Sequence, residues 1–142
     1  MGKLLGFDVG AKRTGLATTD ALQLIASPLR TVETRGLAEA VKAEIATGPV
    51  DGFVVGVPLL MVGGRTDSHD AIDAVVAALN KAFPHIPIHL VDEGNTSVEA
   101  SAIQRMGGMK KSKRQAKGSL DAISASLILQ RHLDATAYGG LG

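Results

Sequence analysis

The spacing between apolar segments changes part-way along this chain, and that change limits how its strands can pair. The first three segments, residues 3–8, 14–19 and 29–34, are short and have the composition of strands. A turn separates the first two, and a loop around Ser27-Pro28 precedes the third. Parallel strands need a crossover of about a dozen residues or more. The sequence therefore predicts a three-stranded antiparallel meander.

Beyond residue 34, helical and strand patterns alternate. Apolar residues at helical spacing predict one helix that ends at Gly48-Pro49 and a second between two strands, residues 53–57 and 86–91. A capping box at 96–99 predicts a third helix, and Ser119 is expected to cap a fourth. Strands joined through helices pair in parallel with right-handed crossovers. The expected fold is an α/β mixed five-stranded sheet, three antiparallel strands plus two parallel, flanked by helices.

Length and composition indicate one ordinary globular domain. The chain has 142 residues, of which 45% are hydrophobic and 20% charged, enough to bury a core. We expect a single domain over residues 1–137 and a flexible tail over residues 138–142. The absence of cysteine excludes disulfides and thiolate metal sites. No apolar run approaches the roughly 20 residues of a membrane span and no signal peptide is evident, so a cytoplasmic location is expected.

Basic residues are concentrated in one segment, although the net charge is only +1. Six of the fifteen Lys and Arg residues lie in thirteen positions without an acid: Arg105, Lys110, Lys111, Lys113, Arg114 and Lys117. Such a run is often just a solvated loop. Its place before Asp121, and the position of Lys12 and Arg13 just after Asp8, favour contacts to nucleic-acid phosphates instead. Because aromatic residues are scarce, stacking on single-stranded bases is not expected to dominate.

Three acidic residues stand where separate elements should end or begin. Asp8 interrupts the first apolar strand, Glu93 follows the last one, and Asp121 opens the final helix. Carboxylates gathered in this way repel one another unless they bind a divalent metal. Two of them also have a simpler interpretation, because Asp8 suits an Asx turn and the helix dipole favours Asp121. Strand alternation alone leaves Asp92 and Glu93 as equal candidates.

Five blocks of sequence, in order, resemble the YqgF family, whose RNase H-like fold is shared with RuvC-type Holliday junction resolvases. The likeness covers roughly residues 4–133. The blocks are residues 5–17 (LGFDVGAKRTGLA), 26–29 (ASPL), 55–59 (VGVPL), 91–100 (VDEGNTSVEA) and 119–129 (SLDAISASLIL).

The resemblance implies a metal-dependent endonuclease that acts on structured nucleic acid. It favours Glu93 over Asp92 and implies that Asp8, Glu93 and Asp121 are catalytic and bind Mg²⁺ or Mn²⁺. The implied substrate is pre-16S rRNA, processed at its 5′ end during ribosome biogenesis, or branched DNA such as a Holliday junction. The implied nucleic-acid contacts are Lys12, Arg13, Lys110, Lys111, Lys113, Arg114 and Lys117. A monomer or weak homodimer is expected.

Two positions depart from the related families. Gly94 stands where the family usually has Arg, and Gly118 stands where RuvC-type sites carry a fourth carboxylate. These changes leave open a catalytically weak protein that binds rRNA without cutting it. Residues 8–15 also resemble the phosphate loop of actin-like ATPases and sugar kinases, whose folds need well over two hundred residues. The metal-dependent nuclease is the main hypothesis.

Overall fold

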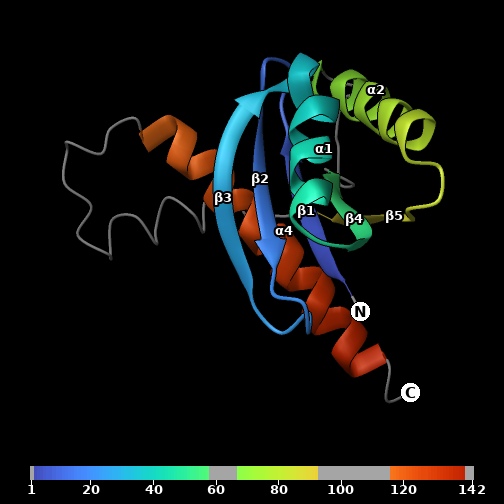
Figure 1. Ribbon diagram of the computed structural model, residues 1–142. Helices are drawn as coiled ribbons and strands as arrows, with labels where there is room; N and C mark the ends of the chain where they lie inside the picture. The colour runs from blue at the N-terminus through green and yellow to red at the C-terminus, as the bar shows by residue number, and fades with distance from the viewer. Residues whose placement is uncertain (1, 58–66, 93–115, 140–142) are drawn as a thin grey trace.

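A mixed sheet with helices on both faces forms the molecule (Figure 1). The computed structural model describes residues 2–57, 67–92 and 116–139. The elements, in chain order, are β1 (Lys3–Val9), β2 (Arg13–Thr19), β3 (Ala26–Glu33), the 3₁₀ turn η1 (Thr34–Gly36), α1 (Leu37–Thr47), β4 (Val50–Val57), α2 (Asp67–Ala82), β5 (Ile88–Asp92) and α4 (Ala116–Gly139).

The sheet confirms the predicted pairing. Its strand order is β3-β2-β1-β4-β5. β2 pairs antiparallel with both β1 and β3, while β4 pairs in parallel with β1 and β5. The central strand β1 is therefore flanked by one antiparallel and one parallel neighbour, as the connection lengths required.

Two sequence-based assignments were wrong. Ser27-Pro28 lies inside β3, which starts at Ala26, and proline is tolerated there because β3 is an edge strand. α4 begins at Ala116, so Ser119 is not its N-cap; Ala116 and Lys117 are good helix formers and extend the helix backwards. α4 extends to Gly139, and the expected flexible tail over residues 138–142 stays a prediction. The helix predicted from residue 96 lies outside the described residues.

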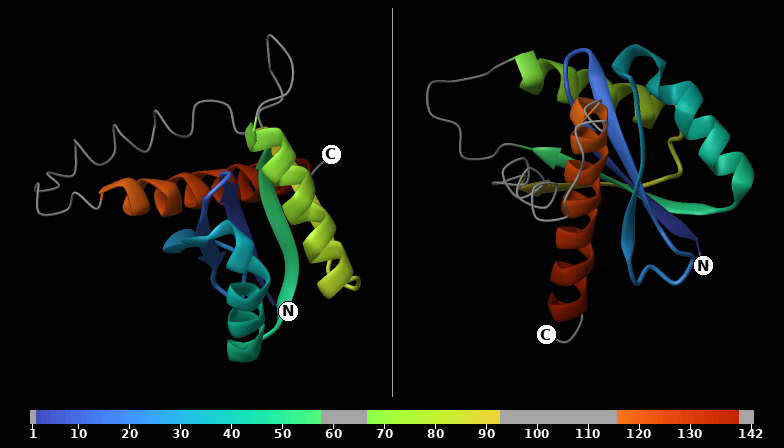
Figure 2. Two further views of the ribbon diagram at one scale, coloured as in Figure 1. Left: turned by 90° about the horizontal axis from the view of Figure 1, so that it is seen from above. Right: turned by 90° about the vertical axis from the view of Figure 1, so that its left-hand side faces the viewer.

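Two hydrophobic clusters occupy the two faces of the sheet. α1 and α2 cover one face, where Phe7 and Phe53 pack edge-to-face with ring centroids 5.7 Å apart. α4 crosses the other face (Figure 2) and buries Ile128 and Leu129 against Val54. Strand alternation explains the division, since successive side chains of one strand point to opposite faces. None of the described helices has both the length and the apolar character needed to cross a membrane.

α4 lies unusually close to the sheet because it crosses glycines on three neighbouring strands. A Cβ at Gly15 of β2 would overlap the backbone carbonyl of Asp121, and one at Gly6 of β1 would lie 2.9 Å from Leu129 Cβ. A Cβ at Gly56 of β4 would meet only the end of the Ile128 side chain. The helix backbone can therefore approach β2 directly, whereas above β4 a flexible side chain fills the space.

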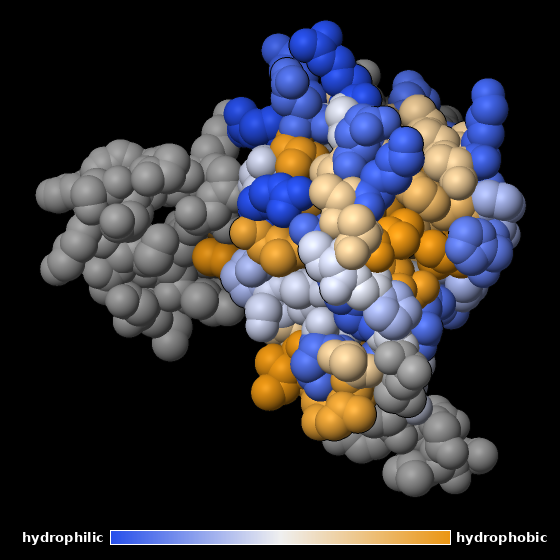
Figure 3. Space-filling view, in the orientation of Figure 1, coloured by the Kyte–Doolittle hydropathy of each residue, from blue (hydrophilic) through white to orange (hydrophobic). Residues whose placement is uncertain are grey.

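The β2–β3 connection is a rigid loop that exposes apolar side chains. The Asp20 carboxylate accepts backbone N–H bonds from Leu22, Leu24 and Ile25 at 2.9–3.2 Å. The bond from Ile25 is the largest cause of the lowered pKa of Asp20. Gln23 has a positive φ of 58° and donates to the Gly2 carbonyl at 2.7 Å. The three apolar side chains are each about two-thirds exposed, and apolar surface gathers at this lower end of the molecule in Figure 3.

We expect substitution of Gly15 by alanine to lower the free energy of unfolding by about 3 kcal/mol or more, the upper range for overpacking. The new methyl group would meet backbone atoms of Asp121, which cannot rotate away. Gly56→Ala should cost less because Ile128 can change rotamer. Gly36→Ala is the matched control, since nothing lies within 4 Å of its Cβ position. Urea unfolding curves measure all three, and equal losses for Gly15→Ala and Gly36→Ala would contradict the close contact.

A histidine pair connects β5 to α4, and its protonation should weaken the fold. The rings of His89 and His132 lie 4.7 Å apart. Burial, and secondarily the charge of His89, lowers the pKa of His132 from its ordinary value of 6.5. As the pH falls through about 6.5, the unfolded chain binds a proton at His132 before the folded one does. Stability should therefore decrease from that pH down to the lower pKa of the folded state.

His132→Gln should remove this part of the pH dependence. Urea midpoints measured at about pH 7.5 and about pH 5.5 give the comparison, with exposed His85→Gln as the control. A wild-type pH response in His132→Gln would show that the pair does not contribute.

Candidate active site

Asp8 faces the α4 side of the sheet. Along β1, Leu4 packs in the cluster beneath α4 and Gly6 contacts that helix directly, whereas Leu5 and Phe7 belong to the opposite cluster. Asp8 follows Gly6 by two residues and therefore shares its face. It is the next-to-last residue of β1 and is partly buried. Its carboxylate consequently lies at the end of the central strand, on the face that α4 covers.

Gly15 brings Asp121 to the same place. Gly15 of β2 is the register partner of Asp8 on β1, and the backbone carbonyl of Asp121 lies directly against Gly15. Asp8 and Asp121 are thus both neighbours of one glycine, on the same face of the sheet. The structure thus places two of the three predicted site residues beside one glycine, although they are 113 positions apart in the sequence. Their catalytic role stays a prediction.

Arg13 lies beside this pair. Its Nε is 3.6 Å from Oδ2 of Asp121, with 43% of the Arg13 side chain and 28% of the Asp121 side chain exposed. An ion pair this exposed contributes about 0–1 kcal/mol at most. It does indicate that a cation can reach the Asp121 carboxylate from the solvent side.

Thr34 fixes the turn that follows Asp8. Its hydroxyl donates to the Gly10 carbonyl at 2.7 Å, and its backbone N–H donates to the Lys12 carbonyl at 2.9 Å. Because that single hydroxyl proton is used, the 2.8 Å contact with the Thr14 hydroxyl must have Thr14 as donor. Gly10 closes the turn through its N–H to the Arg13 carbonyl at 2.9 Å. Sequence reasoning missed Thr34, which sits in η1 and meets the turn only through folding.

The predicted basic residues divide into two groups. Lys12 and Arg13 are exposed at the β1–β2 turn. Arg35, which the sequence gave no reason to select, joins Lys12 and Glu33 around a pocket of about 300 Å³. Hydrophilic side chains cover this upper end of the molecule in Figure 3. Lys110, Lys111, Lys113 and Arg114 lie outside the described residues, and for Lys117 the structure gives only its place in the first turn of α4.

β5 leads toward the third carboxylate. Val91 packs against the cluster beneath α4, and His89 contacts His132 of that helix. Ile88 packs against the opposite cluster. Asp92 ends the strand opposite Val57 of β4. Glu93 lies outside the described residues, so the choice between Asp92 and Glu93 stays a prediction.

Asp8 and Asp121 are suitable ligands for a hard divalent cation. Carboxylate oxygens are what Mg²⁺ and Mn²⁺ prefer, and a cationic group already lies 3.6 Å from Asp121. In the described part of the chain, no three His, Asp or Glu side chains gather closely enough to hold a metal ion.

Comparison with known proteins identifies the family. The family model described as "RuvX: Holliday junction resolvase" matches residues 2–135. The chain belongs to the RuvX family. This confirms the YqgF resemblance found in the sequence, since the two names denote one family.

Relatives match along nearly their whole length. A protein of Parabacteroides distasonis named "Putative pre-16S rRNA nuclease" is 41% identical over 97% of this chain and 99% of its own. A protein of the same name from Porphyromonas gingivalis is 41% identical over 94% and 97%, respectively.

Solved structures of RuvC confirm the RNase H-like fold. Thermus thermophilus RuvC in complex with a Holliday junction substrate superposes with a TM-score of 0.55 at 16% identity, covering 96% of both chains. A second structure of Thermus thermophilus RuvC gives the same TM-score at 18% identity, covering 97% of this chain and 96% of its own. At such identities the likeness concerns the fold alone.

Thr34→Val should loosen the turn after Asp8. The Gly10 carbonyl and the Thr14 hydroxyl would each lose a partner, which should cost about 1–2 kcal/mol of unfolding free energy. Amide hydrogen exchange at Gly10 should become faster as well, because the turn opens more often. Thr47→Val is the control, since that exposed hydroxyl accepts from Lys3 and donates to the Glu44 carbonyl, neither of which belongs to the turn after Asp8. Unchanged exchange at Gly10 in Thr34→Val would contradict the role given to this side chain.

Proposed function

We propose that this chain is a metal-dependent endonuclease that hydrolyses phosphodiester bonds in structured nucleic acid, with the 5′ end of pre-16S rRNA as its substrate. The observation that carries the proposal is the meeting of Asp8 and Asp121 on either side of Gly15. Two acidic side chains from distant parts of the chain share one end of the sheet, beside exposed cations. The names of the relatives support the choice of substrate. A protein that processes rRNA would act in the cytoplasm.

Glu93 completes the proposed site. Val91 lies on the α4 side of β5, and Glu93 is two residues further, the spacing at which strand side chains share a face. The resemblance to YqgF proteins favours the same residue. We take Asp8, Glu93 and Asp121 as ligands of Mg²⁺ or Mn²⁺. An ion held by these carboxylates would supply Lewis-acid chemistry, polarising the scissile phosphate and lowering the pKa of an attacking water.

The chain's own residues would position the substrate. β1 carries Asp8 and α4 carries Asp121, and the close contact of the α4 backbone with Gly15 keeps the two elements near each other. Lys12 and Arg13 would bind phosphates beside the cut, together with the predicted contacts Lys110, Lys111, Lys113, Arg114 and Lys117. Since Gly118 supplies no fourth carboxylate, a second metal would bind only together with substrate. A two-metal mechanism would therefore need the substrate itself to help bind the second metal.

Resolution of DNA junctions is the second candidate, favoured by the description of the RuvX family model. It requires two active sites at a fixed separation, and therefore a dimer. We propose a monomer or weak homodimer, which suits rRNA processing better. A third candidate is a protein that binds rRNA but cuts it slowly, because Gly94 stands where the family usually has Arg.

Cleavage of labelled pre-16S rRNA leader and of a four-way DNA junction, in Mn²⁺, Mg²⁺ or EDTA, tests the proposal. We expect metal-dependent cutting of the RNA. Asp8→Asn, Glu93→Gln and Asp121→Asn should each lower the rate by about 100-fold or more, the loss typical of removing one group that stabilises developing charge.

Asp73→Asn on α2 is the matched control, because this exposed acid lies on the opposite face of the sheet from α4 and should leave the rate unchanged. Cutting of the junction alone would favour the resolvase. Salt-sensitive binding without any cutting would reject the nuclease in favour of a binding protein.

A further inference from the structure

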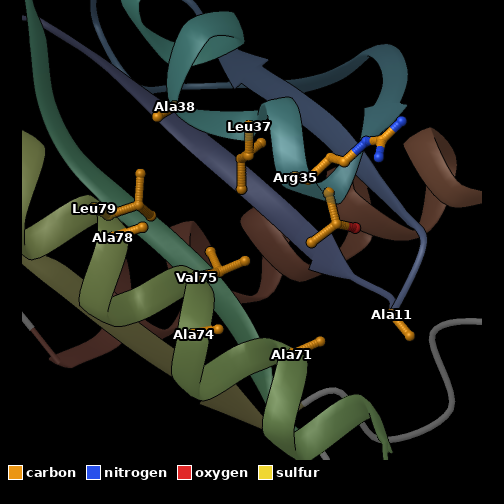
Figure 4. Close-up of a pocket in the computed structure, with 10 residues that line it drawn as sticks. Ala11, Arg35, Leu37, Ala38, Ala71, Ala74, Val75, Ala78 and Leu79 are labelled. Atoms are coloured by element: carbon orange, nitrogen blue, oxygen red, sulfur yellow. The ribbon is translucent and has the colours of Figure 1, made fainter.

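An apolar groove between α1 and α2 begins at Thr34 and Arg35, beside the turn that follows Asp8. It encloses about 330 Å³ on the face of the sheet opposite α4. Its walls are formed mainly by Leu37, Ala38, Ala71, Ala74, Val75 and Ala78. Figure 4 shows the side chains of α2 turned toward α1 across this space, and Figure 3 shows it as a band of apolar surface facing the viewer.

One end of the groove is cationic. Ala11 and Arg35 line both this groove and the adjoining pocket of about 300 Å³, which Lys12 and Glu33 complete. Arg35 is 87% exposed and lies 3.6 Å from Glu33, a pairing too exposed to hold the guanidinium firmly. Two cations and one anion thus surround the entrance to an apolar space. A ligand with a flat apolar body and an anionic group would match both parts.

The entrance lies close to the proposed catalytic carboxylates. Ala11 and Lys12 form the turn between β1 and β2, and Ala11 comes three residues after Asp8. Thr34 holds this turn against the start of α1 through its bonds to Gly10 and Lys12. A nucleic-acid strand bound at Asp8 on one face could therefore pass over the turn and reach the groove on the other.

We propose that the groove binds the base of one unpaired nucleotide that flanks the cleavage site, while Lys12 and Arg35 bind its phosphate. This inference rests on the proposed nuclease function and names the feature of the substrate that the site would select. The volume is near the lower limit for small-ligand pockets, about 300 Å³, and suits a single nucleotide. Bases taken out of a helix are commonly held between aromatic or apolar side chains. A base-paired nucleotide could not enter, so the groove selects single-stranded flanks.

Charge favours this occupant over an apolar peptide or a second copy of the chain. The entrance carries two cations, Lys12 and Arg35, against one anion, Glu33, and an uncharged apolar partner would leave this excess positive charge without a counterion. A nucleotide supplies the phosphate at that position and the apolar surface beyond it.

Binding to RNA hairpins with a four-nucleotide single-stranded flank tests the inference, measured with the full chain in EDTA so that metal-dependent cleavage is absent. One abasic residue is placed at each flank position in turn. We expect one position at which the abasic residue weakens wild-type binding by about tenfold, the loss typical of one buried base. Ala74→Leu, which narrows the groove from an exposed position on α2, should weaken binding of the intact RNA equally. RNA binding by Ala74→Leu should then be the same with and without the abasic residue.

Ala77→Leu is the matched control, an exposed alanine on the same helix that does not line the groove, and it should bind as wild type. Arg35→Gln provides a second test that leaves the apolar walls intact and should weaken intact and abasic RNAs alike. The inference is overturned if no abasic position matters, if Ala74→Leu binds as wild type, or if that variant changes only the sedimentation of the protein.

The two proposals fail in distinguishable ways. Cleavage of rRNA without any abasic effect would retain the nuclease and reject the groove. An abasic effect without cleavage would retain the groove as a nucleotide site and reject the nuclease.

Discussion

The direct contact between the α4 backbone and Gly15 is the constraint on which the rest of this structure depends. It sets how near the helix lies to β2, and so where Asp121 stands relative to Asp8 on the neighbouring strand. Side-chain packing further along the helix, at Leu129 against Gly6, holds the same approach. Because protein interiors are close-packed, a shift at one of these contacts would be transmitted along the helix. The separation of the two carboxylates is therefore determined by backbone packing.

The two faces of the sheet serve different purposes. The face beneath α1 and α2 carries the larger core, including the edge-to-face contacts of Phe53 with Phe7 and Phe83. The face beneath α4 carries small residues and the acidic pair. Most of the buried apolar residues lie on the face beneath α1 and α2. The face beneath α4 can therefore carry charged residues at its end. The β1–β2 turn, held by Thr34, joins the two faces at one end of the sheet.

Local sequence signals predicted the sheet well, because connection length determines which strands can pair and how. They also single out Asp8, an acid that interrupts an apolar strand, and the structure places it at the end of β1 on the α4 side; its catalytic role stays a prediction. They failed where an outcome depends on contacts between distant segments. Pro28 was assigned to a loop because nothing local indicates that β3 is an edge strand. Thr34 was not selected because its partners Gly10 and Lys12 meet it only after the meander forms. The groove likewise needs two helices that are separated by a strand.

The glycine contact also affects how genetic data on this protein would be interpreted. Gly15 has no group that could bind a metal or a phosphate, yet any larger residue there would push Asp121 away from Asp8. Among random variants selected for a folded protein, substitutions at Gly15 should therefore be rare. Purifying selection at a position does not require that the residue touch the substrate, and at Gly15 it would reflect the space needed by its neighbours.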